Sequence, residues 1–148
     1  MSHAQRSIPI IRLYETLIVS VQVEVTDHLV RELKDDVANA IRNQAVRGLI
    51  IEVSGVDIID SYIARSIRDI AQISGLMGVD TILVGLDPGM AITLVEMGMA
   101  LGGIRTTLNL ESALALFGRD AGHQQPEEER LLDMLLSDDT DAEHAEHE

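Results

Sequence analysis

The amino-acid sequence predicts an α/β domain with a mixed sheet of four to five strands flanked by helices. After two opening strands, apolar strands alternate with segments of helical periodicity, a pattern that favours parallel crossovers. The segment 48–53 is apolar almost throughout, which is typical of a parallel strand buried on both faces. Only residues 14–16 separate the two opening strands, which therefore predict a hairpin and an antiparallel edge.

Nine elements are expected, in the order β-β-α-β-α-β-α-β-α. They are strands at 8–13 and 17–21, a helix at 27–44, a strand at 48–53, a helix beginning at Ser61, a strand at 81–85, a helix beginning at Pro88, a strand at 105–108 and a helix at 110–117. Pro9 places the first strand at an edge or strand start, because proline cannot donate to a ladder. Thr26 or Asp27 can cap the first helix, and Asn109 can cap the last.

Composition changes sharply after Gly118. Residues 119–148 contain 11 acidic and 2 basic residues, against 14 acidic and 9 basic in residues 1–118. We therefore expect a domain at 1–118 that folds alone, and an acidic tail at 119–148. Within the tail, leucines predict a short helix at 126–136, followed by disorder.

Composition also excludes several classes of protein. The chain has no cysteine, which excludes disulfides and thiol catalysis. Its net charge of −14 and its three aromatic residues disfavour nucleic-acid binding. The N-terminus lacks signal-peptide character, and no apolar run approaches the ~18 residues of a membrane span. We expect a cytoplasmic protein that binds neither nucleic acid nor membrane.

The most informative segment leads from the strand 48–53 to the helix at Ser61. The carboxyl edge of a parallel sheet, where helices begin, is a favoured position for ligands or modification. No histidine lies nearby in sequence to activate Ser61, so its hydroxyl suits receiving a phosphoryl group better than attacking a substrate. On the residues alone, the commonest role of such a serine is to cap its helix.

Two acidic residues, Asp57 and Asp60, flank this hydroxyl on the N-terminal side. Both suit a helix start through the macrodipole, and both would repel a phosphate of about −1.5 to −2 charges. A phosphorylated Ser61 would thus create a dense anionic patch that disrupts a docked interface.

Other candidate sites are weaker. Thr26 is a second hydroxyl at the same sheet edge, and we expect it to be a helix cap and at most a minor phosphorylation site. His28 is expected at the surface, and His144 and His147 in solvated tail. The turn 85–89 has glycines but lacks a phosphate loop's lysine. The sequence therefore predicts no catalytic residue, cofactor or metal, and no enzyme activity.

Three segments together resemble the STAS domain of anti-sigma-factor antagonists: Asp57-Ile58-Ile59-Asp60-Ser61-Tyr62-Ile63-Ala64, Met77-Gly78, and Val84-Gly85-Leu86-Asp87-Pro88. The opening Ile8-Pro9-Ile10-Ile11-Arg12-Leu13-Tyr14 and the segment Val19-Ser20-Val21-Gln22 are similar to the RsbS-type branch, the stressosome scaffolds. The resemblance covers about residues 8–117.

This resemblance implies a STAS-domain fold and a non-enzymatic scaffold that co-assembles with RsbR-like STAS proteins and itself. It implies that an RsbT-like serine kinase is held by the assembly, phosphorylates Ser61 and is then released. A PP2C-type phosphatase resets the serine. Asp57, Asp60 and Tyr62 are expected to shape the phosphosite loop and contact the kinase. The alternative is a STAS or flavodoxin-like domain that binds a nucleotide or lipid near Ser61.

Overall fold

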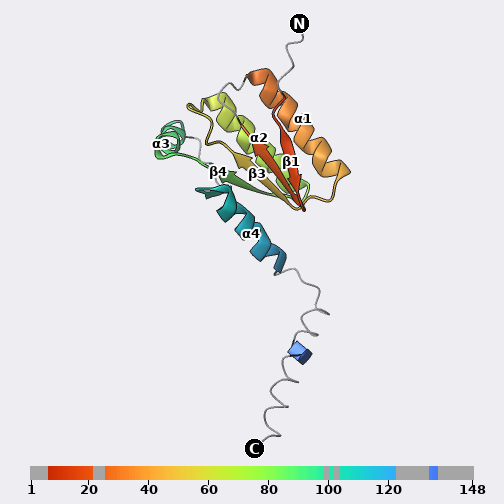
Figure 1. The fold of residues 1–148 in the computed structure, drawn as a ribbon. Coiled ribbons are helices and arrows are strands. Elements are labelled where there is room, and N and C mark those ends of the chain that lie inside the picture. Colours follow the sequence, from red (N-terminus) through yellow and green to blue (C-terminus); the bar gives the residue numbers. More distant parts are fainter. Residues whose placement is uncertain (1–6, 22–25, 99–100, 102–103, 123–133, 137–148) are drawn as a thin grey trace, which may run out of the picture. The chain divides into compact units, whose positions relative to one another are not determined.

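A computed structural model describes residues 7–21, 26–98, 101, 104–122 and 134–136 (Figure 1). The chain divides into two units, Met1–Leu114 and Ala115–Glu148. Its elements are β1 (Ile10–Leu13), β2 (Thr16–Ser20), α1 (Asp27–Asn43), β3 (Gly48–Glu52), α2 (Ser61–Leu76), β4 (Asp80–Val84), α3 (Pro88–Glu96), β5 (Arg105–Thr107) and α4 (Leu110–Gly122). The predicted order of elements is confirmed, and no bound is shifted by more than five residues.

The five strands form one mixed sheet in the order β1-β2-β3-β4-β5. β1 pairs antiparallel with β2 through the predicted hairpin, and β2 to β5 pair in parallel. Ser20, Glu52 and Val84 are in register across β2, β3 and β4, at the carboxyl ends of these strands. The sheet therefore presents one edge where three strands end and α1, α2 and α3 begin.

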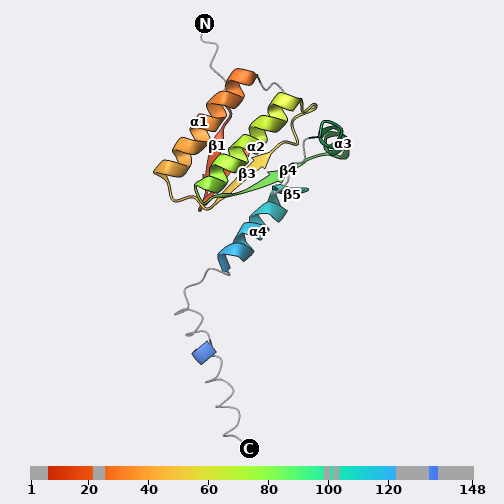
Figure 2. The same cartoon turned by 180° about the vertical axis from the view of Figure 1, so that it is seen from behind.

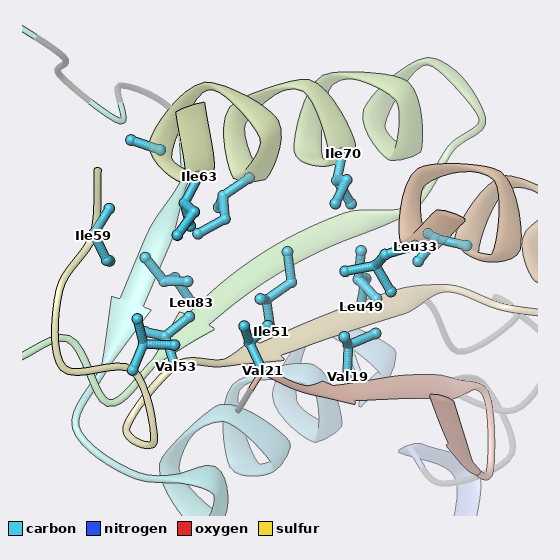
Figure 3. Packing of buried hydrophobic residues seen from close by; sticks show 14 of the residues in the cluster. Val19, Val21, Leu33, Leu49, Ile51, Val53, Ile59, Ile63, Ile70 and Leu83 are labelled. Atoms are coloured by element: carbon cyan, nitrogen blue, oxygen red, sulfur yellow. The ribbon is translucent and has the colours of Figure 1, made fainter. Parts of the chain in front are cut away.

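The central strands are buried on both faces, as their apolar sequence predicts. Leu49, Ile50 and Ile51 of β3 are consecutive residues, and each exposes 1% or less of its surface. α1 and α2 lie side by side against one face of the sheet (Figure 2). From this side Leu33 and Ile70 point toward the strands and complete the core (Figure 3).

Three helices begin at capping side chains, and two of these caps, Thr26 and Asn109, are the predicted ones. The Thr26 hydroxyl accepts a hydrogen bond from the Leu29 amide at 3.3 Å, and Asn109 Oδ1 accepts one from the Ser112 amide at 2.8 Å. Asp87 caps α3, directly before Pro88, in the same way. Local side-chain chemistry therefore determines where these helices begin.

The last helix is longer than expected. α4 continues to Gly122, whereas the helix predicted from the sequence ended at residue 117. A glycine inside a helix costs about 1 kcal/mol relative to alanine and does not by itself end the helix. The tail helix predicted at 126–136 lies outside the described residues except for 134–136, which are helical, and the region 137–148 lies wholly outside them.

Candidate functional site

The segment between β3 and α2 is fastened to the core by apolar side chains. Val53, Val56 and Ile59 expose 0%, 3% and 3% of their surfaces. The Val56 amide also donates to the Val53 carbonyl at 3.0 Å, closing a turn. Figure 3 shows Val53 and Ile59 at the margin of the core below the start of α2. Asp60 and Ser61 therefore follow a loop whose position is fixed by its buried side chains.

Asp60, and not Ser61, caps α2, so the role most expected for Ser61 from its residue type is wrong. Asp60 Oδ1 accepts a hydrogen bond from the Ile63 amide at 2.8 Å, and the Asp60 carbonyl accepts one from Ala64 at 3.0 Å. Aspartate and serine are equally good caps, so the residue type does not decide between them. Asp60 is the cap because its backbone is extended and the helical backbone begins at the next residue. Ser61 is the first helical residue.

Capping by Asp60 leaves the Ser61 hydroxyl uncommitted. Ser61 is exposed, and in the part of the chain that the structure describes its hydroxyl makes no hydrogen bond. The Thr26 hydroxyl, in contrast, is engaged as the cap of α1. Both residues are exposed, but of the two candidate hydroxyls only that of Ser61 is not used as a helix cap.

The other residues predicted for the site, Asp57 and Tyr62, lie on either side of Asp60 and Ser61 in the sequence. Asp57 is exposed on the loop. Tyr62 is half-buried, and its hydroxyl lies 3.5 Å from the Asp27 carbonyl at the start of α1. This long contact shows that the starts of α1 and α2 lie together, which brings Thr26 to the same end of the domain as Ser61.

A polar network centred on Glu52 was not predicted. Glu52 Oε2 accepts a hydrogen bond from the Ser20 hydroxyl at 3.3 Å, and Oε1 accepts one from the Ser54 amide at 2.9 Å. The Ser54 hydroxyl also contacts Oε1. Glu52 thus ties the end of β2 to the first residues of the loop that carries Ser61. A carboxylate at the end of an otherwise apolar strand was the only sequence signal for it.

Gly85 contributes the close packing on the other side of this network. Its φ is +83°, and a Cβ atom built there would lie 2.8 Å from the Ser54 Cβ and 3.1 Å from Glu52 Oε1. The Gly85 amide donates to the Thr107 carbonyl at 3.1 Å. The segment 85–89, predicted only as a turn, therefore also makes room for the start of the phosphosite loop.

The site has an apolar element as well. Ile58 is 78% exposed, although its neighbours Val56 and Ile59 are buried. An exposed isoleucine beside Asp57 and three residues before Ser61 gives a partner protein an apolar contact next to the hydroxyl.

Over residues 7–21, 26–98, 101, 104–122 and 134–136, no group of three or more histidines and carboxylates is placed to hold a metal ion. His28 is exposed, as predicted, and His144 and His147 lie outside those ranges. No helix within the same ranges is long and apolar enough to cross a membrane.

Curated relatives of the chain include two proteins of Bacillus subtilis. The RsbT co-antagonist protein RsbRD is 29% identical over 92 residues, which are 62% of this chain and 33% of that protein. The RsbT co-antagonist protein RsbRB is 28% identical over 109 residues, which are 73% of this chain and 39% of that protein. The chain therefore spans between a third and two fifths of these relatives' lengths.

Solved structures match about three quarters of the chain. RsbS of Moorella thermoacetica, in a serine-to-glutamate variant, has a TM-score of 0.70 and 32% identity, covering 77% of this chain and 97% of that one. A chain from a solved structure of the stressosome, described as a signal integration and transduction hub, has a TM-score of 0.66 and 31% identity. The match covers 76% of this chain and 98% of that one. These matches confirm the resemblance to RsbS-type proteins.

The family model that matches the chain is the STAS domain, over residues 7–113. This range contains all five strands and ends within α4, so it includes the loop, Ser61 and the Glu52 network. The mixed five-stranded sheet with flanking helices is the fold expected from the sequence. The chain belongs to the STAS domain family.

Proposed function

We propose that the chain is a non-enzymatic scaffold of a stressosome-type assembly, and that phosphorylation of Ser61 controls it. Together with RsbR-like STAS partners, the chain sequesters an RsbT-like serine kinase. When that kinase phosphorylates Ser61, the kinase is released and takes part in a bacterial stress response. The observation that carries the proposal is the exposed, uncommitted hydroxyl of Ser61, held at the start of α2 next to the Asp60 cap.

The relatives supply the class of partner. Two of these relatives are named RsbT co-antagonist proteins, and one of the matching structures is of the stressosome. Ser61 needs a kinase and ATP from outside, since no histidine or lysine within the described residues is bonded to its hydroxyl. A PP2C-type phosphatase would restore the hydroxyl.

The alternative function, binding of a nucleotide or lipid at the start of α2, is less well supported. Asp57 and Asp60 are both exposed there and would repel a phosphate that arrives by diffusion. Covalent transfer from ATP does not depend on favourable binding of free phosphate at the site. The same aspartates are therefore compatible with a phosphorylated serine and unfavourable to an anionic ligand.

The proposal predicts which hydroxyl controls kinase release. Particles are assembled from the full chain, an RsbR-like partner and the RsbT-like kinase, and size-exclusion chromatography follows the kinase after ATP is added. Wild-type particles should lose the kinase, whereas Ser61→Ala particles should retain it. Thr26→Asn is the matched control, because asparagine keeps the α1 cap without a hydroxyl, and these particles should release the kinase normally. Release from Ser61→Ala particles would overturn the proposal.

A further inference from the structure

A cation, Arg65, lies on α2 one helical turn beyond Ser61. Arg65 is exposed, and its Nε donates a hydrogen bond to the Ser61 carbonyl at 3.3 Å. Residues four apart on a helix share a face, so the guanidinium lies on the same side of α2 as the Ser61 side chain.

The guanidinium is available for a new partner. Within the described part of the chain, no carboxylate forms an ion pair with Arg65, whereas Lys34 pairs with Asp69 and Arg47 pairs with Glu15. Its contact with a backbone carbonyl uses Nε alone and leaves both terminal nitrogens for another acceptor. Arg65 is thus a positioned, unpaired cation beside a hydroxyl flanked by two aspartates.

We propose that Arg65 is the phosphate-pairing residue of this protein: once Ser61 is phosphorylated, the Arg65 guanidinium pairs with the phosphoryl oxygens and offsets part of the repulsion from Asp57 and Asp60. The inference rests on the proposed function, since it concerns the phosphorylated form. Arginine suits the role because its planar donors meet phosphate oxygens two at a time.

The pairing has a measurable consequence for the charge of the phosphate. A nearby cation favours the doubly charged form, whereas Asp57 and Asp60 favour the singly charged form. The second ionisation of phosphoserine falls near pH 6, so the balance decides how much dianion a partner meets near neutral pH. Removing Arg65 should weaken the acid.

The test uses the full chain with phosphoserine inserted at position 61 during translation, so it does not depend on any kinase. Phosphorus NMR follows the phosphate from pH 4 to pH 9. Arg65→Gln should lower the second acid dissociation constant about threefold relative to the unsubstituted chain. Arg65→Lys should restore part of the effect, because it keeps the charge without the planar donors.

Arg42→Gln is the matched control. Arg42 is also exposed, but it lies in the last turn of α1, whereas the first turn of α1 is the one near the phosphosite. It should leave the titration unchanged. The difference in titration midpoint between Arg65→Gln and the unsubstituted chain should become smaller in 0.5 M salt, because salt screens the interaction between exposed charges. Equal titration midpoints for Arg65→Gln and the unsubstituted chain would overturn the inference. If the kinase failed to modify Ser61, that result would count against the proposed function. It would not affect this titration, because the phosphoserine is inserted during translation.

Discussion

Replacing Gly85 with alanine should lower the free energy of unfolding by about 3 kcal/mol. A left-handed backbone costs an ordinary residue about 1–2 kcal/mol, and overpacking adds about 1–3 kcal/mol. Both apply at Gly85, whose φ is +83° and where a Cβ would lie 2.8 Å from the Ser54 Cβ. Urea unfolding followed by circular dichroism measures the change.

Gly78 is the matched control for this substitution. Its φ is +82°, but nothing lies within 4 Å of the Cβ that an alanine would add. Gly78→Ala should therefore cost only the backbone term, about 1–2 kcal/mol. The difference between the two variants measures the packing at Ser54. Equal losses in both variants would show that the close approach of Gly85 to the phosphosite loop contributes nothing.

Phosphorylation of Ser61 should weaken binding to the RsbT-like kinase about 100-fold and leave the fold intact. The phosphate adds about −1.5 to −2 charges beside Asp57 and Asp60. Like charges brought together at an interface cost several kcal/mol, and a loss of about 2.8 kcal/mol is 100-fold in affinity. Arg65 offsets only part of this charge. Isothermal titration calorimetry with the phosphorylated and unmodified proteins measures the change.

Substitutions separate charge from shape at the same position. Ser61→Asp adds one negative charge and should weaken kinase binding about tenfold, while Ser61→Asn has nearly the same shape without the charge and should bind almost as the wild type does. All forms should melt within a few degrees of one another, because Ser61 is exposed and a helix start tolerates negative charge. Equal kinase affinity for the phosphorylated and unmodified proteins would contradict release by electrostatic repulsion.

The fold was predictable because its signals are local. The apolar run at 48–53 is a buried parallel strand, and the caps at Thr26, Asp87 and Asn109 begin their helices where the sequence places them. α4 was expected to end at residue 117 but continues to Gly122, because a single glycine weakens a helix without ending it. Strand and helix periodicities depend on neighbours within a few residues, which the sequence shows directly.

The site was only partly predictable, because part of it depends on register and packing. Asp60 and Ser61 are both good caps, and one residue's backbone decides which of them is used. Glu52 meets Ser20 because β2 and β3 pair in that register, which no local pattern specifies. The close approach of Gly85 to Ser54 likewise depends on how β3 and β4 pack.

We expect the hydroxyl of Ser61, which is exposed and does not cap α2, to be the phosphoryl acceptor. The most direct test is incubation of the full chain with the RsbT-like kinase and ATP, followed by intact-mass measurement and site localisation by tandem mass spectrometry. The structure predicts one phosphate per chain on Ser61, with at most a minor fraction on Thr26, whose hydroxyl caps α1. A stoichiometric phosphate on Thr26 or on any other residue, with Ser61 unmodified, would contradict control through Ser61.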